Sequence, residues 1–399
     1  MLDLEDRLDE LNQLGLHQRM RMVSGPQGPH VVLEGRPVLL LCSGNALGLA
    51  DHPLVRQAAA DAAMRWGVGA GAARVSCGTM TLHRRLEERL ANFTGQRSAL
   101  LFGSGVLANL GVIPALARRG EIVLHDELSH CSIVDGCRLS GADVMPYRHG
   151  DPDHLAWALR QCDGRATLIA TDGMFGMDGD VAPLRELALV ARVQGAMLYV
   201  DDAHGVGVLG PEGRGTVAAA RLGPDAAPLQ LVTLGKALGS YGAAVVGDGD
   251  FIQHLSETAR SYIYTTALPP GQAAASLAAV KLARRETWRR EKLIAAIARF
   301  REGAAQRGFE LMPSHTAIQP MPCANEADAL AFAKALEMQG YWVSAIRPPT
   351  VADGKSRLRI TLTALHTPVE IDGLLDALSF ARDAIGQGFG ADTAALAQA

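Results

Sequence analysis

LQLVTLGKALGSYGAAVVG, residues 229–247, is the stretch from which the fold can be worked out. It begins with an apolar run rich in β-branched residues, 229–233, which predicts a buried strand. Lys236 follows among small residues. Because burial disfavours the charged form of a lysine and lowers its pKa, a lysine just past a buried strand can be a neutral nucleophile that forms a Schiff base with a carbonyl. The alternative is a surface lysine in a turn.

The segments around this stretch alternate between strands and helices. Such alternation predicts an α/β fold with a mostly parallel, doubly wound sheet covered on both faces. Ligands on sheets of this kind bind at the carboxyl ends of the strands. Strands are predicted at residues 97–102, 121–124, 143–147, 167–171, 197–201, 230–233 and 243–246, and helices at 53–66, 79–93, 105–118 and 129–139.

The two ends of the chain have a different pattern. Residues 1–22 predict a helix with leucines on one face, and residues 31–41 predict a hairpin that turns at Glu34-Gly35. A long helix at 270–305, kinked or broken, leads to strands near 315–321, 341–346 and 357–363 and helices at 326–339 and 368–385. We therefore expect an N-terminal helix and hairpin segment at 1–50, a large α/β domain at 51–285 and a small C-terminal α+β domain at 286–399.

Composition excludes several classes of protein. The chain has 399 residues, of which 48% are hydrophobic and 20% charged, as in ordinary soluble proteins. The net charge of −4 argues against a nucleic-acid binder, which would show a basic stripe. The N-terminus is acidic and amphipathic, unlike a signal peptide. The uncharged run at 98–117 is long enough to be a candidate membrane span, but its glycines and Pro114 predict a strand, a turn and a helix instead.

The cysteines point to the cellular compartment. The six cysteines are scattered and form no Cys-x-x-Cys pair, so neither a zinc site nor a disulfide framework is indicated. A reducing, cytoplasmic setting is the expectation that follows.

Glycine-rich and polar segments follow several of the predicted strands. Gly105 and Val106 open a helix after one strand, and the backbone N–H groups of a helix N-terminus bind phosphate; a plain tight turn is the alternative. Asp201 ends another strand, and His204 comes three residues later. Asp201 could pair with a protonated ring nitrogen, or it could cap a helix.

Two further polar segments follow predicted strands. His130 follows the strand at 121–124 and could stack on a flat cofactor, although a lone histidine can equally be structural. Thr233 and Lys236 follow the strand at 230–233. A phosphate cradle, a carboxylate for a ring nitrogen, a stacking imidazole and a lysine for a Schiff base are the groups that pyridoxal 5′-phosphate (PLP) requires. The small-residue stretch 67–78 could let backbone approach a ligand, or it could be a linker.

Eight motifs of the chain resemble those of the α-oxoamine synthases, a branch of the fold-type I PLP enzymes. Together they span nearly the whole chain. Within the family, the AIRPPTV segment with LRITLTALH is most similar to the members that act in biotin synthesis. The motifs are SGNALGLADHP, LFGSGVLAN, HDELSHCS, TDGMFGMDGD, VDDAHGVGVLGPEGRG, TLGKALG, YIYTTALPP and AIRPPTV followed by SRLRITLTALH.

The sequence departs from the family pattern in two places. Gly44-Asn45-Ala46 stands where the family usually has Asn-Asp-Tyr or Asn-Asn-Tyr. Gly176 stands where a serine is common, which removes one hydroxyl contact to the cofactor. Neither departure touches Lys236 or Asp201, so we expect an active enzyme.

The resemblance implies a role for each residue around the cofactor ring. Lys236 would hold PLP as a Schiff base and then act as base and acid at the substrate Cα. Asp201 would pair with the pyridine nitrogen, His204 with the ring 3-oxygen, and His130 would stack on the ring beside the substrate.

The resemblance also implies contacts to the phosphate and the substrates. Thr233 would join Gly105 and Val106 at the phosphate. Thr265 and Thr266 would reach the phosphate of a neighbouring subunit, which implies a homodimer with shared active sites. Arg359 would bind the amino-acid carboxylate, a bidentate task that suits a guanidinium. The residues that would line the acyl site are Thr350 and either Arg19 or Arg21.

The expected activity is a PLP-dependent decarboxylative condensation. L-alanine would react with pimeloyl-CoA or pimeloyl carrier protein to give 8-amino-7-oxononanoate, CO2 and free thiol. The alternatives are another α-oxoamine synthase, which would use glycine or serine and a different acyl group, and a PLP-fold protein that binds without catalysis. We expect no metal, nucleic-acid or membrane partner.

Overall fold

The computed structural model describes residues 4–13 and 20–386. Its centre is a seven-stranded sheet in which one strand, β10, runs antiparallel to both neighbours while the others are parallel to one another, which confirms the predicted α/β fold. In order across the sheet, the strands are β4 (Ser98–Phe102), β10 (Ala243–Gly247), β9 (Leu229–Thr233), β8 (Met197–Asp201), β7 (Ala166–Asp172), β5 (Ile122–Asp126) and β6 (Asp143–Tyr147).

Helices cover both faces of this sheet because successive side chains of each strand point to opposite sides. In β4, Leu100 and Phe102 join one core, and Ala99 and Leu101 join the other. The first core is closed by α4 (Gly105–Leu116), α5 (Cys131–Ser140), α9 (Gly249–Thr258) and α10 (Arg260–Ile263). The opposite face is covered by α3 (Thr81–Thr94), α6 (Pro152–Arg160), α7 (Leu184–Gln194), α8 (Thr216–Ala219) and α11 (Pro270–Arg285), and α2 (Pro53–Trp66) packs on α11.

The uncharged run at 98–117 is β4, a turn and α4, as predicted. Ser104 caps α4, because its side chain accepts a hydrogen bond from the Leu107 N–H at 3.2 Å. In the part of the chain that the structure describes, no helix is both long enough and apolar enough to cross a membrane.

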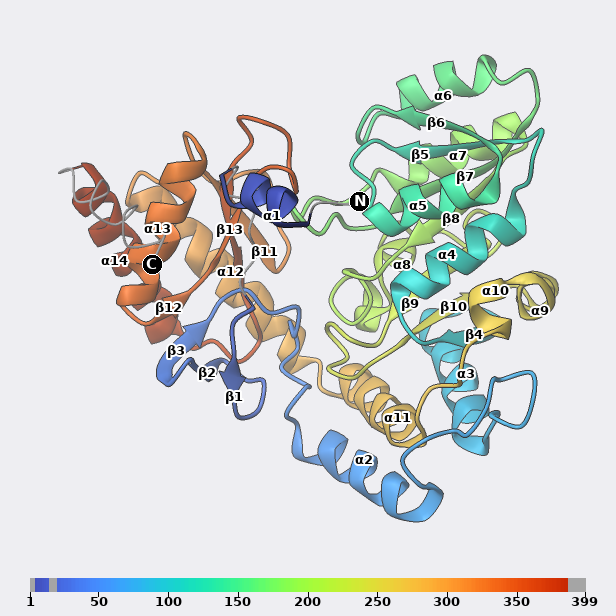
Figure 1. The fold of residues 1–399 in the computed structure, drawn as a ribbon, viewed down its shortest axis with the longest axis horizontal. Helices are drawn as coiled ribbons and strands as arrows, with labels where there is room; N and C mark the ends of the chain where they lie inside the picture. The colour runs from blue at the N-terminus through green and yellow to red at the C-terminus, as the bar shows by residue number, and fades with distance from the viewer. Residues whose placement is uncertain (1–3, 14–19, 387–399) are drawn as a thin grey trace.

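A second, smaller part of the molecule lies beside the sheet domain (Figure 1). It contains an antiparallel sheet of β11 (Ile318–Pro322), β14 (Arg357–Thr361) and β13 (Ser344–Ile346). The predicted break in the long helix is confirmed, since α11 ends at Arg285 and α12 (Trp288–Gln306) leads into this part. Its other helices are α13 (Glu326–Met338) and α14 (Pro368–Ala384).

The N-terminal hairpin joins this smaller part. The hairpin of β2 (His30–Leu33) and β3 (Arg36–Leu40) turns at Glu34 and Gly35, as predicted, and β1 (Val23–Ser24) pairs with β2. β12 (Tyr341–Trp342) then pairs in parallel with β3. The domain boundaries at residues 50 and 285 stay a prediction.

Two predictions of secondary structure were wrong in detail. The strand expected at 341–346 is two strands in different sheets, because Val343 is buried between them and β13 pairs with β14. The helix expected at 1–22 is described only as α1 (Leu4–Gln13), and residues 20–22 are not helical. Arg21 forms ion pairs there with Glu34 and Glu337, and the Glu34 N–H donates to the Met22 carbonyl at 2.9 Å, so this segment lies against the hairpin.

Candidate active site

Lys236 and His204 meet at the carboxyl edge of the central sheet. Lys236 follows β9, His204 follows β8, and Lys236 Nζ lies 2.7 Å from His204 Nε2. Burial lowers the pKa of Lys236, against the opposing effect of Asp201 and Asp172. Burial also lowers the pKa of His204 well below its ordinary value, with a further contribution from the Lys236 charge. The arrangement therefore favours a neutral, nucleophilic amine beside a neutral imidazole.

Asp201 is fixed in position at the end of β8. It is buried, and its Oδ1 accepts a hydrogen bond from the Ala203 N–H at 3.0 Å. Its Oδ2 accepts from the Asn109 side chain at 2.8 Å. Asn109 is fully buried, accepts from the Tyr199 hydroxyl at 2.8 Å and donates to Ser132 Oγ at 2.9 Å. The bonds to Tyr199 and Ser132 thus fix the Asn109 amide that orients the carboxylate of Asp201.

Asn109 and Asp172 were not found from the sequence. The available signal for Asn109 was a lone amide among the apolar residues of α4, within the LFGSGVLAN motif. Asp172 ends β7 directly beside Asp201 in the register of the sheet, and its Oδ2 accepts from the His130 N–H at 2.9 Å. Burial, together with the charge of Asp201, raises the pKa of Asp172 well above its ordinary value. The shift favours the neutral form of Asp172 beside Asp201.

His130 begins α5 at the same edge of the sheet. It is the N-cap residue, its Nδ1 accepts from the Ser132 N–H at 3.3 Å, and the same nitrogen lies 2.7 Å from Ser132 Oγ. The side chain is exposed in this chain. A ring fixed through Nδ1 and open on its surface is suited to stacking, so the predicted role of His130 is retained as a proposal.

The start of α4 offers backbone donors for an anion. Ser104 caps the helix, so Gly105 and Val106 occupy its first turn, where N–H groups have no acceptor within the helix and the positive end of the helix dipole lies. Thr233 Oγ1 donates to the Gly242 carbonyl at 3.4 Å and accepts from the Gly235 N–H at 3.3 Å. β4 and β9 both run antiparallel to β10, so both segments leave the sheet at the same edge.

Gly44 makes a close approach to Lys236. A Cβ atom at residue 44 would lie 3.3 Å from Lys236 Cγ, closer than most side chains tolerate. The departure from the family pattern at this position therefore leaves room for the lysine side chain.

Gly176 lies between Arg359 and His204. Arg359 lies on β14, and its Nε donates to the Gly176 carbonyl at 2.7 Å. A Cβ atom at Gly176 would lie 2.5 Å from His204 Nε2, so a larger residue at this position would require the imidazole to move. Among the described residues, no hydrogen bond or ion pair engages the two terminal nitrogens of Arg359.

Other predicted site residues contact other parts of the chain. Thr265 and Thr266 follow α10, and Thr266 forms an isolated bridge with Ala73 of the small-residue stretch. Arg21 is engaged by two carboxylates, Thr350 is exposed with its N–H donating to the Arg347 carbonyl at 3.0 Å, and Arg19 lies outside the described residues. The roles of these residues stay predictions.

The donor set at this edge fits PLP. A buried lysine suits the aldehyde, a fixed carboxylate suits the pyridine nitrogen, an imidazole beside the lysine suits the ring oxygen, and a helix N-terminus suits the phosphate. By contrast, the residues that the structure describes include no group of three or more His, Cys, Asp or Glu side chains placed to hold a metal ion.

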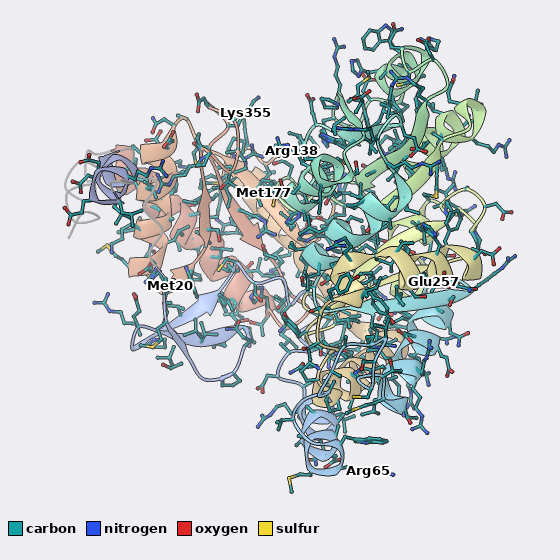
Figure 2. All side chains as sticks on the ribbon, turned by 45° about the vertical axis from the view of Figure 1, so that its right-hand side comes forward. Met20, Arg65, Arg138, Met177, Glu257 and Lys355 are labelled. Atoms are coloured by element: carbon teal, nitrogen blue, oxygen red, sulfur yellow. The ribbon has the colours of Figure 1, made fainter. Side chains whose placement is uncertain are left out.

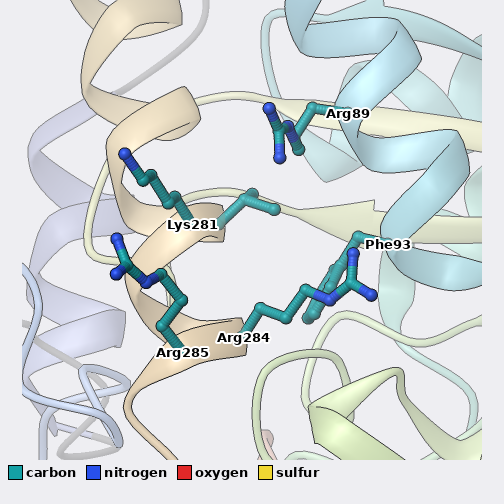
Figure 3. A pocket seen from close by; sticks show the side chains of 6 residues that line it. Arg89, Phe93, Lys281, Arg284 and Arg285 are labelled. Carbon is teal, nitrogen blue, oxygen red and sulfur yellow. The ribbon is translucent and has the colours of Figure 1, made fainter.

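A surface hollow of about 370 Å³ lies elsewhere, between α3 and α11 (Figure 3). Its lining is basic and includes Arg89, Lys281 and Arg284 around Phe93. None of the predicted site residues lines it.

Comparison with known proteins gives one consistent result. The chain matches the class I and II aminotransferase family over residues 36–378. An 8-amino-7-oxononanoate synthase of Xanthomonas euvesicatoria pv. vesicatoria (strain 85-10) is 51% identical over 390 residues, which cover 96% of this chain and 97% of the relative. A synthase of the same name from Xylella fastidiosa (strain M23) is 50% identical over 388 residues, with the same coverage of 96% and 97%.

Solved structures agree with these relatives. A serine palmitoyltransferase from S. paucimobilis, with a bound PLP–myriocin aldimine, superposes with a TM-score of 0.90 at 30% identity and covers 96% of this chain and 97% of its own. An 8-amino-7-oxononanoate synthase from Francisella tularensis has a TM-score of 0.75 at 28% identity, covering 86% of this chain and 97% of its own.

Proposed function

The chain belongs to the class I and II aminotransferase family, within its α-oxoamine synthase branch, and on this premise we propose that it makes 8-amino-7-oxononanoate. The reaction is the PLP-dependent decarboxylative condensation of L-alanine with a pimeloyl thioester, which releases CO2 and free thiol in biotin synthesis. The observation that carries the proposal is the buried Lys236 in contact with His204, beside an oriented Asp201, in a chain 51% identical to a synthase of that name.

PLP is the cofactor, and four elements of the chain would hold it. Lys236 would attach its aldehyde, Asp201 would face the ring nitrogen, His204 would face the ring oxygen, and the start of α4 would bind the phosphate. Bound PLP supplies an electron sink that accepts the electron pair left at the substrate Cα when a proton is removed.

Lys236 would be the base that takes this proton and the acid that returns one. Its lowered pKa increases the fraction of neutral amine at neutral pH, which a general base requires. His204, 2.7 Å from Nζ, restricts where the amine can lie. Asn109 and the Ala203 N–H hold Asp201 in one orientation, so its carboxyl group is already in place before the cofactor binds.

Arg359 would bind the carboxylate of L-alanine. Its Nε is occupied by the Gly176 carbonyl, which orients the guanidinium plane. The terminal nitrogens can then donate two parallel hydrogen bonds to a carboxylate. Because Gly176 also lies against His204, the same contact sets the distance between the carboxylate site and Lys236.

The partners follow from the same proposal. Thr265 and Thr266 would contribute to the phosphate site of a second copy of the chain, so the enzyme would work as a homodimer. Thr350 and an N-terminal arginine, Arg19 or Arg21, would line the acyl site. The acyl donor would be pimeloyl-CoA or a pimeloyl carrier protein, and the reaction would take place in the cytoplasm.

A panel of amino acids crossed with acyl thioesters tests the proposal, with free thiol as the readout. We expect the highest kcat/KM with L-alanine and a pimeloyl thioester. A preference for glycine or serine with another acyl group would assign a different α-oxoamine synthase activity. If no pair released thiol, and borohydride left the visible absorbance of the PLP-treated protein unchanged, the chain would be a binding protein and not an enzyme.

A further inference from the structure

A short loop of the sheet domain contacts the smaller part of the molecule. It consists of residues 173–181, between β7 and α7, and is called the bridging loop below. The loop is closed on itself, because Met174 pairs with Val181, the Phe175 N–H donates to the Asp180 carbonyl at 2.9 Å, and the Gly179 N–H donates to the Phe175 carbonyl at 2.9 Å. It can therefore act as one rigid piece.

The tip of the bridging loop contacts the smaller part at several points. The Gly176 carbonyl accepts from Arg359 Nε at 2.7 Å, and Asp178 forms an ion pair with Arg357. Arg357 and Arg359 are two residues apart on β14 and so point to the same face of the sheet. Met177, at the tip, lies at the boundary between the two parts in Figure 2.

The Gly179 carbonyl provides the third point of contact. It accepts hydrogen bonds from Ser314 Oγ at 3.0 Å and from Thr316 Oγ1 at 2.9 Å, both of which precede β11. A Cβ atom at Gly179 would lie 2.6 Å from the Ile318 carbonyl oxygen. The loop is therefore packed closely against the smaller part.

The base of the bridging loop is held by His149, which comes from the segment between β6 and α6. His149 Nε2 lies 3.0 Å from Asp180 Oδ2, and Nδ1 lies 2.9 Å from Asp126 Oδ1. Asp126 ends β5, is fully buried, and also accepts from the Gly150 N–H at 2.8 Å. The edge of the Phe175 ring packs against the imidazole with 4.5 Å between ring centroids.

The charge of His149 strengthens this contact. Hydrogen bonds to Asp126 and Asp180 raise the pKa of His149 to about 10, so the ring is a cation between two carboxylates at neutral pH. Both ring nitrogens then donate, and charge-assisted hydrogen bonds are roughly twice as strong as neutral ones. The backbone N–H of His149 donates to Glu127 Oε1 at 2.9 Å, which also fixes the main chain at this residue.

We propose that His149 is a positioning residue for the condensation: it fixes Asp180, and through the bridging loop it fixes the Gly176 carbonyl that orients Arg359. The contacts form an unbroken path from the end of β5 to the carboxylate site on β14. His149 touches neither Lys236 nor Arg359, so it acts only through the loop. The inference rests on the proposed function in one respect, that Arg359 binds the substrate carboxylate.

Two variants distinguish a positioning role of His149 from a general effect on the stability of the protein. His149→Gln removes the cation, and Asp180→Asn weakens the same contact from the loop side while leaving the buried Asp126–His149 pair in place. The matched control is His154→Gln, because His154 lies five residues away at the start of α6 and contacts the Arg148 N–H instead of the loop. Retention of fold is checked by thermal unfolding.

The first readout is hydrogen exchange in the PLP-free protein, which does not depend on any activity. We expect the peptide covering residues 173–181 to exchange faster in both test variants and unchanged in the control. The second readout is the dissociation constant for L-alanine, from the spectrum of the PLP-bound protein. We expect it to rise roughly two- to thirty-fold in both test variants, the range for a residue that acts through others. KM for the acyl thioester should stay unchanged.

The two readouts together decide the proposal. Exchange that stays at the wild-type rate in both variants would show that His149 does not hold the loop. Faster exchange with an unchanged alanine constant would show a structural role only, and a weakened alanine constant without faster exchange would show that the loop is not the route. Each of these results overturns the proposal. If the chain proved not to condense alanine at all, the proposed function would fail, while the exchange data would still report on the loop.

Discussion

Asn109 donates a hydrogen bond to Asp201 across 2.8 Å, from a helix on one face of the sheet to the end of a strand 92 positions later in the chain. Asn109 Oδ1 accepts from the Tyr199 hydroxyl, and Nδ2 also donates to Ser132 Oγ. Asp201 is therefore held by a group that cannot rotate without breaking two further hydrogen bonds. Orientation of the carboxylate is built into the fold and does not depend on the cofactor.

Asn109→Ala is expected to slow removal of the substrate Cα proton while PLP stays bound. The change removes one donor to Asp201 and leaves the Tyr199 hydroxyl without its acceptor, and a lost hydrogen bond to a charged group costs about 1.5–3 kcal/mol. If the transition state loses the same stabilisation, exchange of the Cα proton should slow roughly ten- to a hundred-fold. Deuterium exchange at Cα of L-alanine, without acyl thioester, measures it. Asp201→Asn should show the larger defect, and wild-type exchange in both variants would remove Asp201 from the mechanism.

Lys236→Ala should abolish thiol release without unfolding the protein. One amine is assigned both the attachment of the cofactor and the proton transfer at Cα, so two steps fail together. Borohydride reduction followed by peptide mass analysis should label Lys236 in the wild type and nothing at this position in the variant. A variant that kept a sizeable fraction of wild-type turnover would show that another group carries the reaction.

Arg359→Ala should chiefly weaken binding of L-alanine. Loss of a charge-assisted hydrogen bond to a carboxylate costs on the order of 1.5–3 kcal/mol, which corresponds to a rise of roughly ten- to a hundred-fold in the dissociation constant. Arg359→Lys should not restore binding, since an ammonium cannot both donate to Gly176 and form a bidentate pair. Titration of the cofactor spectrum with L-alanine is the measurement. Wild-type titration curves for both variants would move the carboxylate site elsewhere.

The stabilisation supplied by His149 should depend on pH. The pKa of His149 is raised to about 10 by Asp126 and Asp180 in the folded protein, and an unfolded histidine has a pKa of about 6.5. A pKa raised by folding gives stabilisation that is fully present below about pH 6.5 and is lost as the pH rises through about 10. The gap in free energy of unfolding between the wild type and His149→Gln should therefore narrow from about pH 6 to about pH 10. Urea unfolding of the PLP-free proteins measures the gap, and a gap that widened with pH would contradict the ion-pair geometry.

A shared active site predicts complementation between two inactive chains. One variant is Lys236→Ala, and the other carries both Thr265→Ala and Thr266→Ala. In a mixed dimer, one site combines both defects and the other has neither, so activity should recover to about half that of a wild-type dimer. Thiol release from mixed and separately tagged chains measures it, after subtraction of the activity of the threonine variant alone. If the tags co-purify and activity stays at that background, the threonines serve the site of their own chain.

Much of the central sheet could be predicted because its strands carry their own signals. The bounds predicted for the strands at 143–147 and 197–201 agree with the structure to the residue, and each strand has an apolar centre close to a glycine that ends the preceding helix. The carboxyl-edge residues Asp201 and Lys236 could be located for the same reason. Once a strand is predicted, the residues that follow its carboxyl end are also placed at that edge of the sheet.

Other features depend on contacts that no local pattern contains. Asn109 and Asp172 acquire their roles only when distant segments meet at Asp201 and His130. The separation of β12 from β13 depends on pairing with the N-terminal hairpin, whereas residues 341–346 by themselves predict one continuous strand. His149 was missed because its two partners are distant in sequence: Asp126 ends β5, and Asp180 lies in the bridging loop.

The parallel pairing of β12 with β3 has a consequence for synthesis of the protein. Tyr341 and its partner Leu39 are about 300 residues apart, so at about 5–20 residues per second the hairpin leaves the ribosome roughly 15 to 60 seconds before its partner strand exists. During that interval the apolar side chains that will pack together beneath Trp342 are uncovered; they are Val31, Leu33, Val38 and Leu40. The hairpin is thus completed only after the strands of the central sheet have been made, and a nascent chain stalled before residue 341 exposes an unpaired strand edge to chaperones or to other nascent chains.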